Sequence, residues 1–254
     1  MEREIEEIAG HLRRVERVLF ITGAGMSADS GLPTYRGIGG LYEGRFAEEE
    51  MPIEAVLSGE MLQQRPELTW KYMLQMEEAC RGAVFNEGHR VIAQIEERKP
   101  GSWVLTQNID GFHGDAGSRN LIEIHGRLRD LFCLNCEYAR TVEDFSGLEL
   151  PPWCPECGGL VRPDVVLFGE FLSEDRVRVM QRELERGFDM VFSIGTTSVF
   201  PYIAQPVLEA SYMGIPTVEI NPGETEVSHA VDYRLAMGAA EALGWIWEAA
   251  GLED

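Results

Sequence analysis

The chain has 254 residues, 44% of them hydrophobic, so it can bury a core as one large domain or as a large and a small one. Its formal net charge of −21 argues against non-specific nucleic-acid binding, which needs a basic surface. The acidic excess fits either the binding of basic protein segments or simple hydration of the surface. No apolar run reaches the roughly 20 residues of a membrane helix, and the charged amphipathic start does not resemble a signal peptide. We therefore expect a cytoplasmic protein without a membrane partner.

The first strand leads directly into a glycine-containing loop. Residues 5–15 have helical apolar spacing, and residues 18–21 form a short apolar run typical of a buried parallel strand. Gly23 and Gly25 follow in Gly-x-Gly order. Glycines at a strand end let backbone N–H groups approach phosphate oxygens, and a following helix N-terminus favours anions. The stretch predicts a dinucleotide loop; a tight turn between strand and helix is the alternative.

The next segment does not fit a hydride-transfer Rossmann protein. Such a protein should show a second strand ending in an acidic residue about 20 residues further on. Instead, residues 32–40 form a glycine-rich loop and residues 52–98 have helical spacing. We interpret this region as a loop and an inserted helical module, which counts against a dehydrogenase.

Two later strands end in polar residues. Residues 103–106 run into Gln107, Asn108 and Asp110, and residues 121–124 run into His125. Open α/β sheets bind ligands beyond the carboxyl ends of their strands. His125 is a candidate general base, because an imidazole with a pKa of roughly 6.5 suits proton transfer near neutral pH. The other four histidines we interpret as structural.

The cysteines predict a zinc site. Cys133 and Cys136 form one Cys-x-x-Cys pair, and Cys154 and Cys157 form another, with 17 residues (137–153) between the pairs. This spacing is typical of a zinc ribbon. Four thiolates leave no open coordination position, so the zinc would be structural. A redox role is the alternative, but two pairs at this spacing disfavour it. Cys80 we interpret as a small buried residue.

The last third of the chain alternates strands and helices. Residues 162–170 read as a strand and turn, 171–187 as a helix, 189–194 as a buried strand, 201–213 as a helix, 217–220 as a strand, and the chain from 239 as a helix. This alternation predicts an α/β fold with a Rossmann-like parallel sheet. The helical insertion and the zinc ribbon should form a smaller domain.

Seven motifs in order resemble the sirtuin family of NAD-dependent protein-lysine deacylases, especially bacterial and archaeal members without long extensions. They cover residues 23–27 with 30–36, then 107–110, 125–126, the four cysteines, 165–170, 195–196 and 220–221. The resemblance implies an NAD-binding domain of residues 1–36, 100–126 and 170–254. It implies a small domain made of a loop and helical module (37–99) and a zinc-ribbon module (127–169).

The resemblance also implies a role for each matched residue. Catalysis would rest on His125 with Asn108 and Asp110. NAD, as co-substrate, would be bound by Gly23, Ala24, Gly25, Ser27, Tyr35, Arg36, Gln107, Asn108, Asp110, Gly195, Thr196, Thr197, Asn221 and Ala240. The acyl-lysine of a protein or peptide would lie beside Val166, Phe168, Gly169 and Glu170. One structural zinc ion would be held by Cys133, Cys136, Cys154 and Cys157.

The acyl pocket departs from one family pattern. Members that remove succinyl or malonyl groups carry a Tyr-x-x-Arg pair, which falls here on Met73 and Met76. A register shifted by one residue would give Tyr72 and Gln75, and neither register supplies an arginine for a carboxylate. We therefore expect neutral acyl groups, acetyl or longer aliphatic chains. The alternative is that the methionines are only core residues.

The family chemistry implied by the resemblance makes the acyl oxygen the nucleophile toward C1′ of the nicotinamide ribose. His125 would then take a proton from a ribose hydroxyl, and the acyl group would leave on ADP-ribose. One alternative is an ADP-ribosyltransferase or NAD glycohydrolase that uses the same site without acyl-lysine. Another is a non-catalytic nucleotide-binding module with a zinc ribbon, against which His125 argues.

Overall fold

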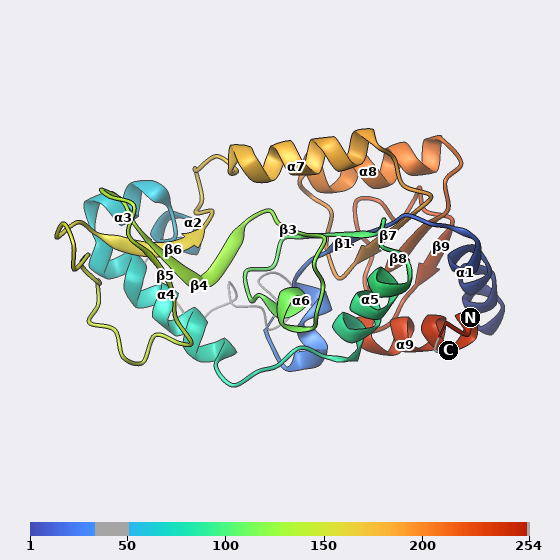
Figure 1. Ribbon diagram of the computed structural model, residues 1–254, viewed down its shortest axis with the longest axis horizontal. Coiled ribbons are helices and arrows are strands. Elements are labelled where there is room, and N and C mark those ends of the chain that lie inside the picture. Colours follow the sequence, from blue (N-terminus) through green and yellow to red (C-terminus); the bar gives the residue numbers. More distant parts are fainter. Residues whose placement is uncertain (34–50, 253–254) are drawn as a thin grey trace.

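The structure is a computed structural model that describes residues 1–33 and 51–252. The elements form two parts at opposite ends of the long axis (Figure 1). The larger part holds the first and last helices, and the smaller part holds a second sheet. Within the described residues, no helix has the length and apolar character needed to span a membrane.

The larger part is built on a six-stranded parallel sheet. Its strands run in the order β3-β2-β1-β7-β8-β9. Every residue of β1, β7 and β8 is buried, as expected for strands covered on both faces. The bounds are β1 Val18–Thr22, β2 Trp103–Thr106, β3 Leu121–Glu123, β7 Met190–Ile194, β8 Thr217–Ile220 and β9 Tyr233–Leu235.

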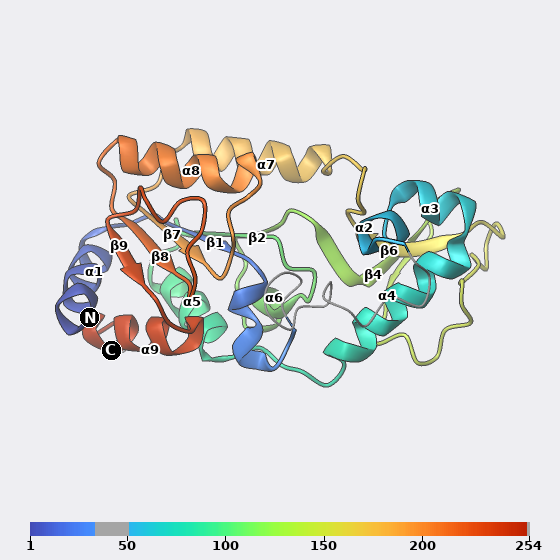
Figure 2. The ribbon, with the colours of Figure 1, turned by 180° about the vertical axis from the view of Figure 1, so that it is seen from behind.

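Helices cover both faces of this sheet (Figures 1 and 2). One face packs against α1 Glu2–Arg14, α5 Glu87–Arg98 and α9 Ala239–Ala250, and the other against α7 Glu174–Glu185 and α8 Pro201–Tyr212. In α1 the apolar residues Ile5, Ile8 and Leu12 recur at helical spacing and are buried. The first strand leads into two short 3₁₀ turns, η1 Ala24–Met26 and η2 Ala28–Ser30, and a short α6 spans Phe112–Asp115.

The smaller part packs three helices on a three-stranded antiparallel sheet of order β5-β4-β6. Trp70 is fully buried there, donates its Nε1–H to the carbonyl of Val161 at 3.1 Å, and lies 5.4 Å from the ring of Phe145. The bounds are α2 Ile53–Val56, α3 Gly59–Gln64, α4 Pro66–Cys80, β4 Gly126–Cys133, β5 Ala139–Thr141 and β6 Val161–Val165.

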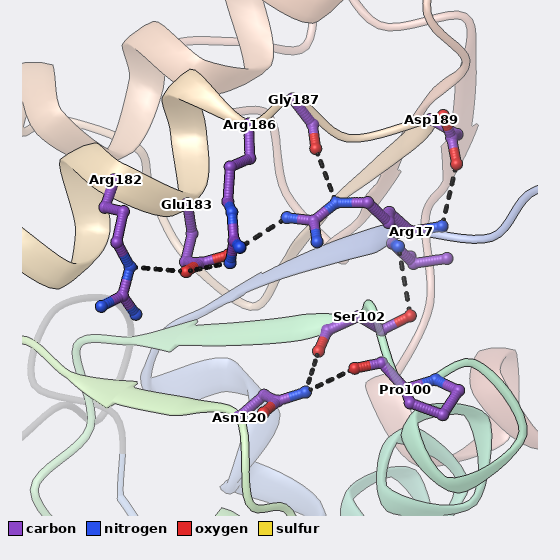
Figure 3. A network of polar contacts seen from close by, with 10 residues as sticks. Arg17, Pro100, Ser102, Asn120, Arg182, Glu183, Arg186, Gly187 and Asp189 are labelled. Atoms are coloured by element: carbon purple, nitrogen blue, oxygen red, sulfur yellow. Dashed lines mark hydrogen bonds and ion pairs between the residues drawn. The ribbon is translucent and has the colours of Figure 1, made fainter.

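A polar network holds the amino ends of the large sheet together (Figure 3). Arg17, just before β1, donates to the carbonyl of Gly187 at 2.9 Å and to Glu183 at 3.2 Å. Glu183 is 1% exposed and also accepts from Arg182 on α7 and from Arg186, which directly follows that helix. These bonds fix α7 against the start of the central strand. Because this network lies at the amino end, it leaves the loops at the opposite, carboxyl end of the sheet free to line a site.

The predicted α/β fold, a Rossmann-like parallel sheet with a smaller part made of a helical insertion and a zinc ribbon, is confirmed, and the smaller part has its own antiparallel sheet. Three details differ from the sequence-based expectations. The helix expected from residue 171 begins at Glu174. The strand β9 was not expected, and β4 continues from Gly126 through a region where only the cysteines had been noted.

Candidate active site

Five strand ends of the large sheet converge on one place. The chain turns from β1 toward β2 and β3 on one side, whereas β7, β8 and β9 lie on the other, so the topology switches between β1 and β7. In such sheets the crevice at the switch point is where ligands bind. The loops that begin at Gly23, Gln107, His125, Gly195 and Asn221 all follow carboxyl ends of these strands.

The loops after β1 and β7 touch through their backbones. The N–H of Gly25 donates to the carbonyl of Gly195 at 2.8 Å. A Cβ on Gly25 would lie 2.7 Å from the Cα of Gly195, and Gly195 itself has φ +59°, so both positions need glycine. The backbone N–H groups of Ala24, Thr196 and Thr197 find no acceptor within the described residues. Free N–H groups on two adjoining loops make a site for an anion such as a phosphate.

A cavity of about 780 Å³, here called the main cavity, opens between these loops and the smaller part. Sixteen of the residues predicted from the sequence line it: Gly23, Ala24, Gly25, Gln107, Asn108, His125, Gly195, Thr196, Thr197 and Asn221 on the nucleotide side, and Met73, Met76, Val166, Phe168, Gly169 and Glu170 on the acyl side. The described residues thus bring together groups that lie far apart in the sequence.

A smaller cavity of about 350 Å³, the side cavity, shares Ala24, Met76 and Asn108 with the main cavity. Asn108 donates to the carbonyl of Gly23 at 3.0 Å and to the hydroxyl of Ser27 at 3.2 Å. Ser27 in turn donates to Asp110 at 2.7 Å. Burial raises the pKa of the Asp110 carboxyl, while hydrogen bonds from the N–H of Phe112 and from Ser27 oppose that shift.

His125 is held at both ring nitrogens. Its Nδ1 lies 3.0 Å from the carbonyl oxygen of Gln107, and its Nε2 lies 2.6 Å from the hydroxyl of Tyr202. Burial lowers the pKa of His125, and the hydrogen bond to Gln107 opposes that shift only in part. The imidazole is therefore neutral at pH 7 and has the protonation state of a general base.

The acyl side of the main cavity is apolar. Met73 and Met76, on α4, are 1% and 8% exposed and both line the cavity. No lysine or arginine lines it within the described part of the chain. Glu170 also lines it, but its carboxylate is occupied: Arg162, which is 5% exposed, binds it at 2.5 and 3.0 Å, and the N–H of Leu167 donates to it at 2.9 Å.

The four predicted metal ligands lie together in the smaller part. Their Sγ atoms are all within 4.8 Å of one another, with Cys133 and Cys157 3.4 Å apart and Cys136 and Cys154 3.6 Å apart. A tetrahedron with Zn–S bonds of about 2.3 Å has S–S edges of about 3.8 Å. The donor set and its geometry therefore fit one zinc ion.

Comparison with known proteins identifies the family. Residues 23–201 match the Sir2 family, and a relative from Pseudomonas aeruginosa, "NAD-dependent protein deacylase 2", is 52% identical over 243 residues. That match covers 94% of each chain. This chain belongs to the Sir2 family.

Solved Sir2 structures superimpose on nearly the whole chain. A mutant Sir2 homologue in complex with 2′-O-acetyl ADP ribose has a TM-score of 0.85 at 33% identity, covering 96% of this chain and 95% of that one. A Sir2–p53 peptide–NAD⁺ structure has a TM-score of 0.79 at 29% identity, covering 97% and 98%. Both the sequence and the fold of this sirtuin therefore have close counterparts.

Some residues of this sirtuin lie elsewhere than the sequence suggested. Tyr35 and Arg36 lie outside the described residues. Ser27 and Asp110 line the side cavity only. Ala240 lies in the first turn of α9, where its N–H donates to Asp29 at 2.9 Å; Asp29, rather than Ala240, lines the main cavity.

Sequence reasoning missed Phe200 and Tyr202. Both line the main cavity beside His125. Phe200 directly precedes α8 and Tyr202 lies in its first turn, a segment for which the sequence predicted a helix and no role in the site. The nearest available signal was the aromatic pair directly after the Gly195–Thr197 loop.

Proposed function

We propose that this sirtuin is an NAD-dependent protein-lysine deacylase that transfers the acyl group to ADP-ribose and releases nicotinamide. The observation that carries the proposal is the position of neutral His125. It lies in one cavity between the glycine loops after β1 and β7 and the apolar wall formed by Met73, Met76 and Phe168. A nucleotide and an acyl-lysine can therefore meet at a single proton acceptor.

Separate groups of residues would bind NAD and carry out the proton transfer. The N–H groups at Ala24, Thr196 and Thr197 would bind the phosphates of NAD. Asn108 and Asp110 would hold the nicotinamide and its ribose. Attack of the acyl oxygen on C1′ expels nicotinamide, and Nε2 of His125 would then accept the proton of a ribose hydroxyl, whose oxygen attacks the acyl carbon. Water completes the release of free lysine and O-acyl-ADP-ribose.

The acyl-lysine would approach along residues 166–170, which follow β6, and its backbone would add there as a strand. We propose that the acyl group is neutral, acetyl or a longer aliphatic chain, because the cavity wall holds two methionines and no cation within the described residues. A basic sequence around the lysine would suit the net charge of −21. We also propose that the protein acts in the cytoplasm, since none of its five cysteines is in a disulfide.

The test is a coupled measurement of nicotinamide and deacylated peptide. Purified protein is incubated with NAD and an acetyl-lysine peptide, and with the unmodified peptide as control. We expect one nicotinamide and one O-acetyl-ADP-ribose per free lysine, and no nicotinamide with the control peptide. Nicotinamide release that is independent of acyl-lysine would instead indicate NAD glycohydrolase or ADP-ribosyltransferase activity.

A further inference from the structure

The first turn of α8 brings two aromatic rings against His125. The ring of Tyr202 lies 6.1 Å from the imidazole at an interplanar angle of 83°, and the ring of Phe200 lies 6.1 Å away at 84°. The two aromatic rings stack on each other, 5.5 Å apart at 16°. The imidazole is therefore confined by two edge-on contacts as well as by its hydrogen bonds.

The hydrogen bonds determine which nitrogen of His125 carries the proton. The carbonyl of Gln107 can only accept, so Nδ1 must be the N–H that donates to it at 3.0 Å. In a neutral ring Nε2 is then unprotonated, and the hydroxyl of Tyr202 must donate to it at 2.6 Å. Burial raises the pKa of Tyr202 to about 12, so the phenol keeps its proton at neutral pH.

We propose that Tyr202 is a positioning residue for His125: together with the Gln107 carbonyl, which sets the tautomer, its hydroxyl holds the imidazole in the orientation that leaves Nε2 as the acceptor for the ribose proton. The Tyr202 hydroxyl donates to the lone pair of Nε2 that would accept the ribose proton. The ribose hydroxyl would therefore replace the phenol at Nε2 without any rotation of the imidazole. The catalytic half of this inference rests on the proposed function.

The chain that leads to Tyr202 is itself constrained. Ser198 has φ +55°, and no other non-glycine residue in the described ranges has a positive φ. Ser198 is 1% exposed, its N–H donates to the hydroxyl of Thr196 at 3.1 Å, and its own hydroxyl lies 3.3 Å from that of Ser193. The turn therefore sets the position of Tyr202 relative to the loop that faces the nucleotide.

Few other groups can influence the charge of His125. Burial and the Gln107 carbonyl account for its pKa shift. The charged side chains that line the main cavity within the described residues are Asp29 and Glu170, and Glu170 is paired with Arg162. A hydrogen bond donated to the neutral imidazole disfavours its protonation. Loss of the Tyr202 hydroxyl should therefore raise the pKa of His125.

The test compares Tyr202→Phe with Tyr212→Phe. Phenylalanine keeps the ring that stacks on Phe200, and Tyr212, in the same helix, is 94% exposed and serves as the control. Nitrogen-15 NMR of histidine-labelled protein, with His125 assigned from a His125→Gln variant, reports the tautomer and pKa directly. We expect an unprotonated, hydrogen-bonded Nε2 in the parent and in Tyr212→Phe. In Tyr202→Phe we expect that bond to be lost and the pKa to rise.

Kinetics separate positioning from a purely structural role. Acyl-dependent exchange of labelled nicotinamide into NAD precedes the proton transfer, so it should stay within about twofold of the parent in Tyr202→Phe. The kcat of deacylation should fall about tenfold. A general base contributes a factor of roughly 10²–10⁴ to the rate, and the hydrogen bond to Gln107 still positions His125 in part when the Tyr202 hydroxyl is lost. The acid limb of the rate profile should move to higher pH, and the peptide KM should be unchanged.

Two results would overturn the inference. One is a pKa of His125 in Tyr202→Phe that equals that of the parent, a result that overturns the inference even if the protein proves not to be a deacylase. The other is an equal fall of exchange and deacylation together, which would indicate a structural role. Absence of acyl-dependent nicotinamide release in the parent would count against the proposed function alone.

Discussion

The acyl pocket offers a direct test of substrate choice. Met73 and Met76 are almost fully buried, and the wall they belong to has no cation within the described residues, so a succinyl carboxylate would lose its hydration there without gaining a partner. The double substitution Met73→Tyr with Met76→Arg would supply a hydroxyl and a guanidinium. A hydrogen bond to a charged group contributes about 1.5–3 kcal/mol, which corresponds to about 10- to 150-fold in kcat/KM.

The assay measures kcat/KM for acetyl-, octanoyl- and succinyl-lysine forms of one peptide. The parent should prefer the two neutral groups, and the double variant should shift the succinyl-to-acetyl ratio toward succinyl by the factor above. Met213→Arg, at a residue that directly follows α8, is 65% exposed and does not line the main cavity, is the matched control and should leave the ratio unchanged. An unchanged ratio in the double variant, or a parent that already favours succinyl-lysine, would refute the reasoning.

Three further predictions concern the base, the metal and the fold. His125→Ala should slow deacylation at least 100-fold, and full turnover of this variant would contradict the assignment of His125 as the base. Because burial lowers the pKa of His125 below 6.5, the parent should keep its activity down to a pH below that value. Elemental analysis should find one zinc in the parent and in Cys80→Ser, whereas Cys154→Ser should lose the metal and unfold at lower temperature. Glu183→Gln should cost about 2 kcal/mol and lower the unfolding midpoint by roughly 5 °C at pH 7, with exposed Glu185→Gln as control. Burial opposes ionisation of Glu183, but bonds from Arg182, Arg17 and Arg186 hold its pKa below the usual 4.5. The stability lost in Glu183→Gln should therefore vanish as the pH falls through the folded-state pKa of Glu183. An equal loss of stability at low pH would count against the ion pairs.

The parts of the fold that sequence could predict are those with strong periodic or apolar signals. The strands β1, β7 and β8 were recognisable because strands buried on both faces need uninterrupted apolar runs. Strand β9 was not, because only Leu235 of its three residues is buried. In β4, buried and half-buried residues do not alternate regularly, and the register shifts between Arg127 and Leu131, which removes the period that would have identified a strand.

The site was predictable where chemistry follows a strand end, and less so elsewhere. His125 and the Gly195 loop could be singled out because polar residues directly after apolar runs mark the carboxyl edge of the sheet. The pairing of Tyr202 with His125 joins residues 77 positions apart, and no local pattern encodes it. Likewise only the folded chain shows that Arg162 binds the carboxylate of Glu170, a residue predicted from the sequence to lie beside the substrate.

The backbone contact between Gly25 and Gly195 determines how the nucleotide side of the protein can fluctuate. Gly23 bonds to the carbonyl of Ile194, Gly25 to that of Gly195, and Gly195 to that of Ile220. The bonds of Gly23 and Gly25 join the ends of β1 and β7, and the bond of Gly195 joins β7 to β8, so exposing all three amide protons requires these strands to separate. Their hydrogen exchange should therefore follow unfolding of the central sheet. The loops after β1 and β7 should therefore not open separately from the sheet on the nucleotide side of the main cavity. Adjustment to substrates of different size is left to the methionine-lined half.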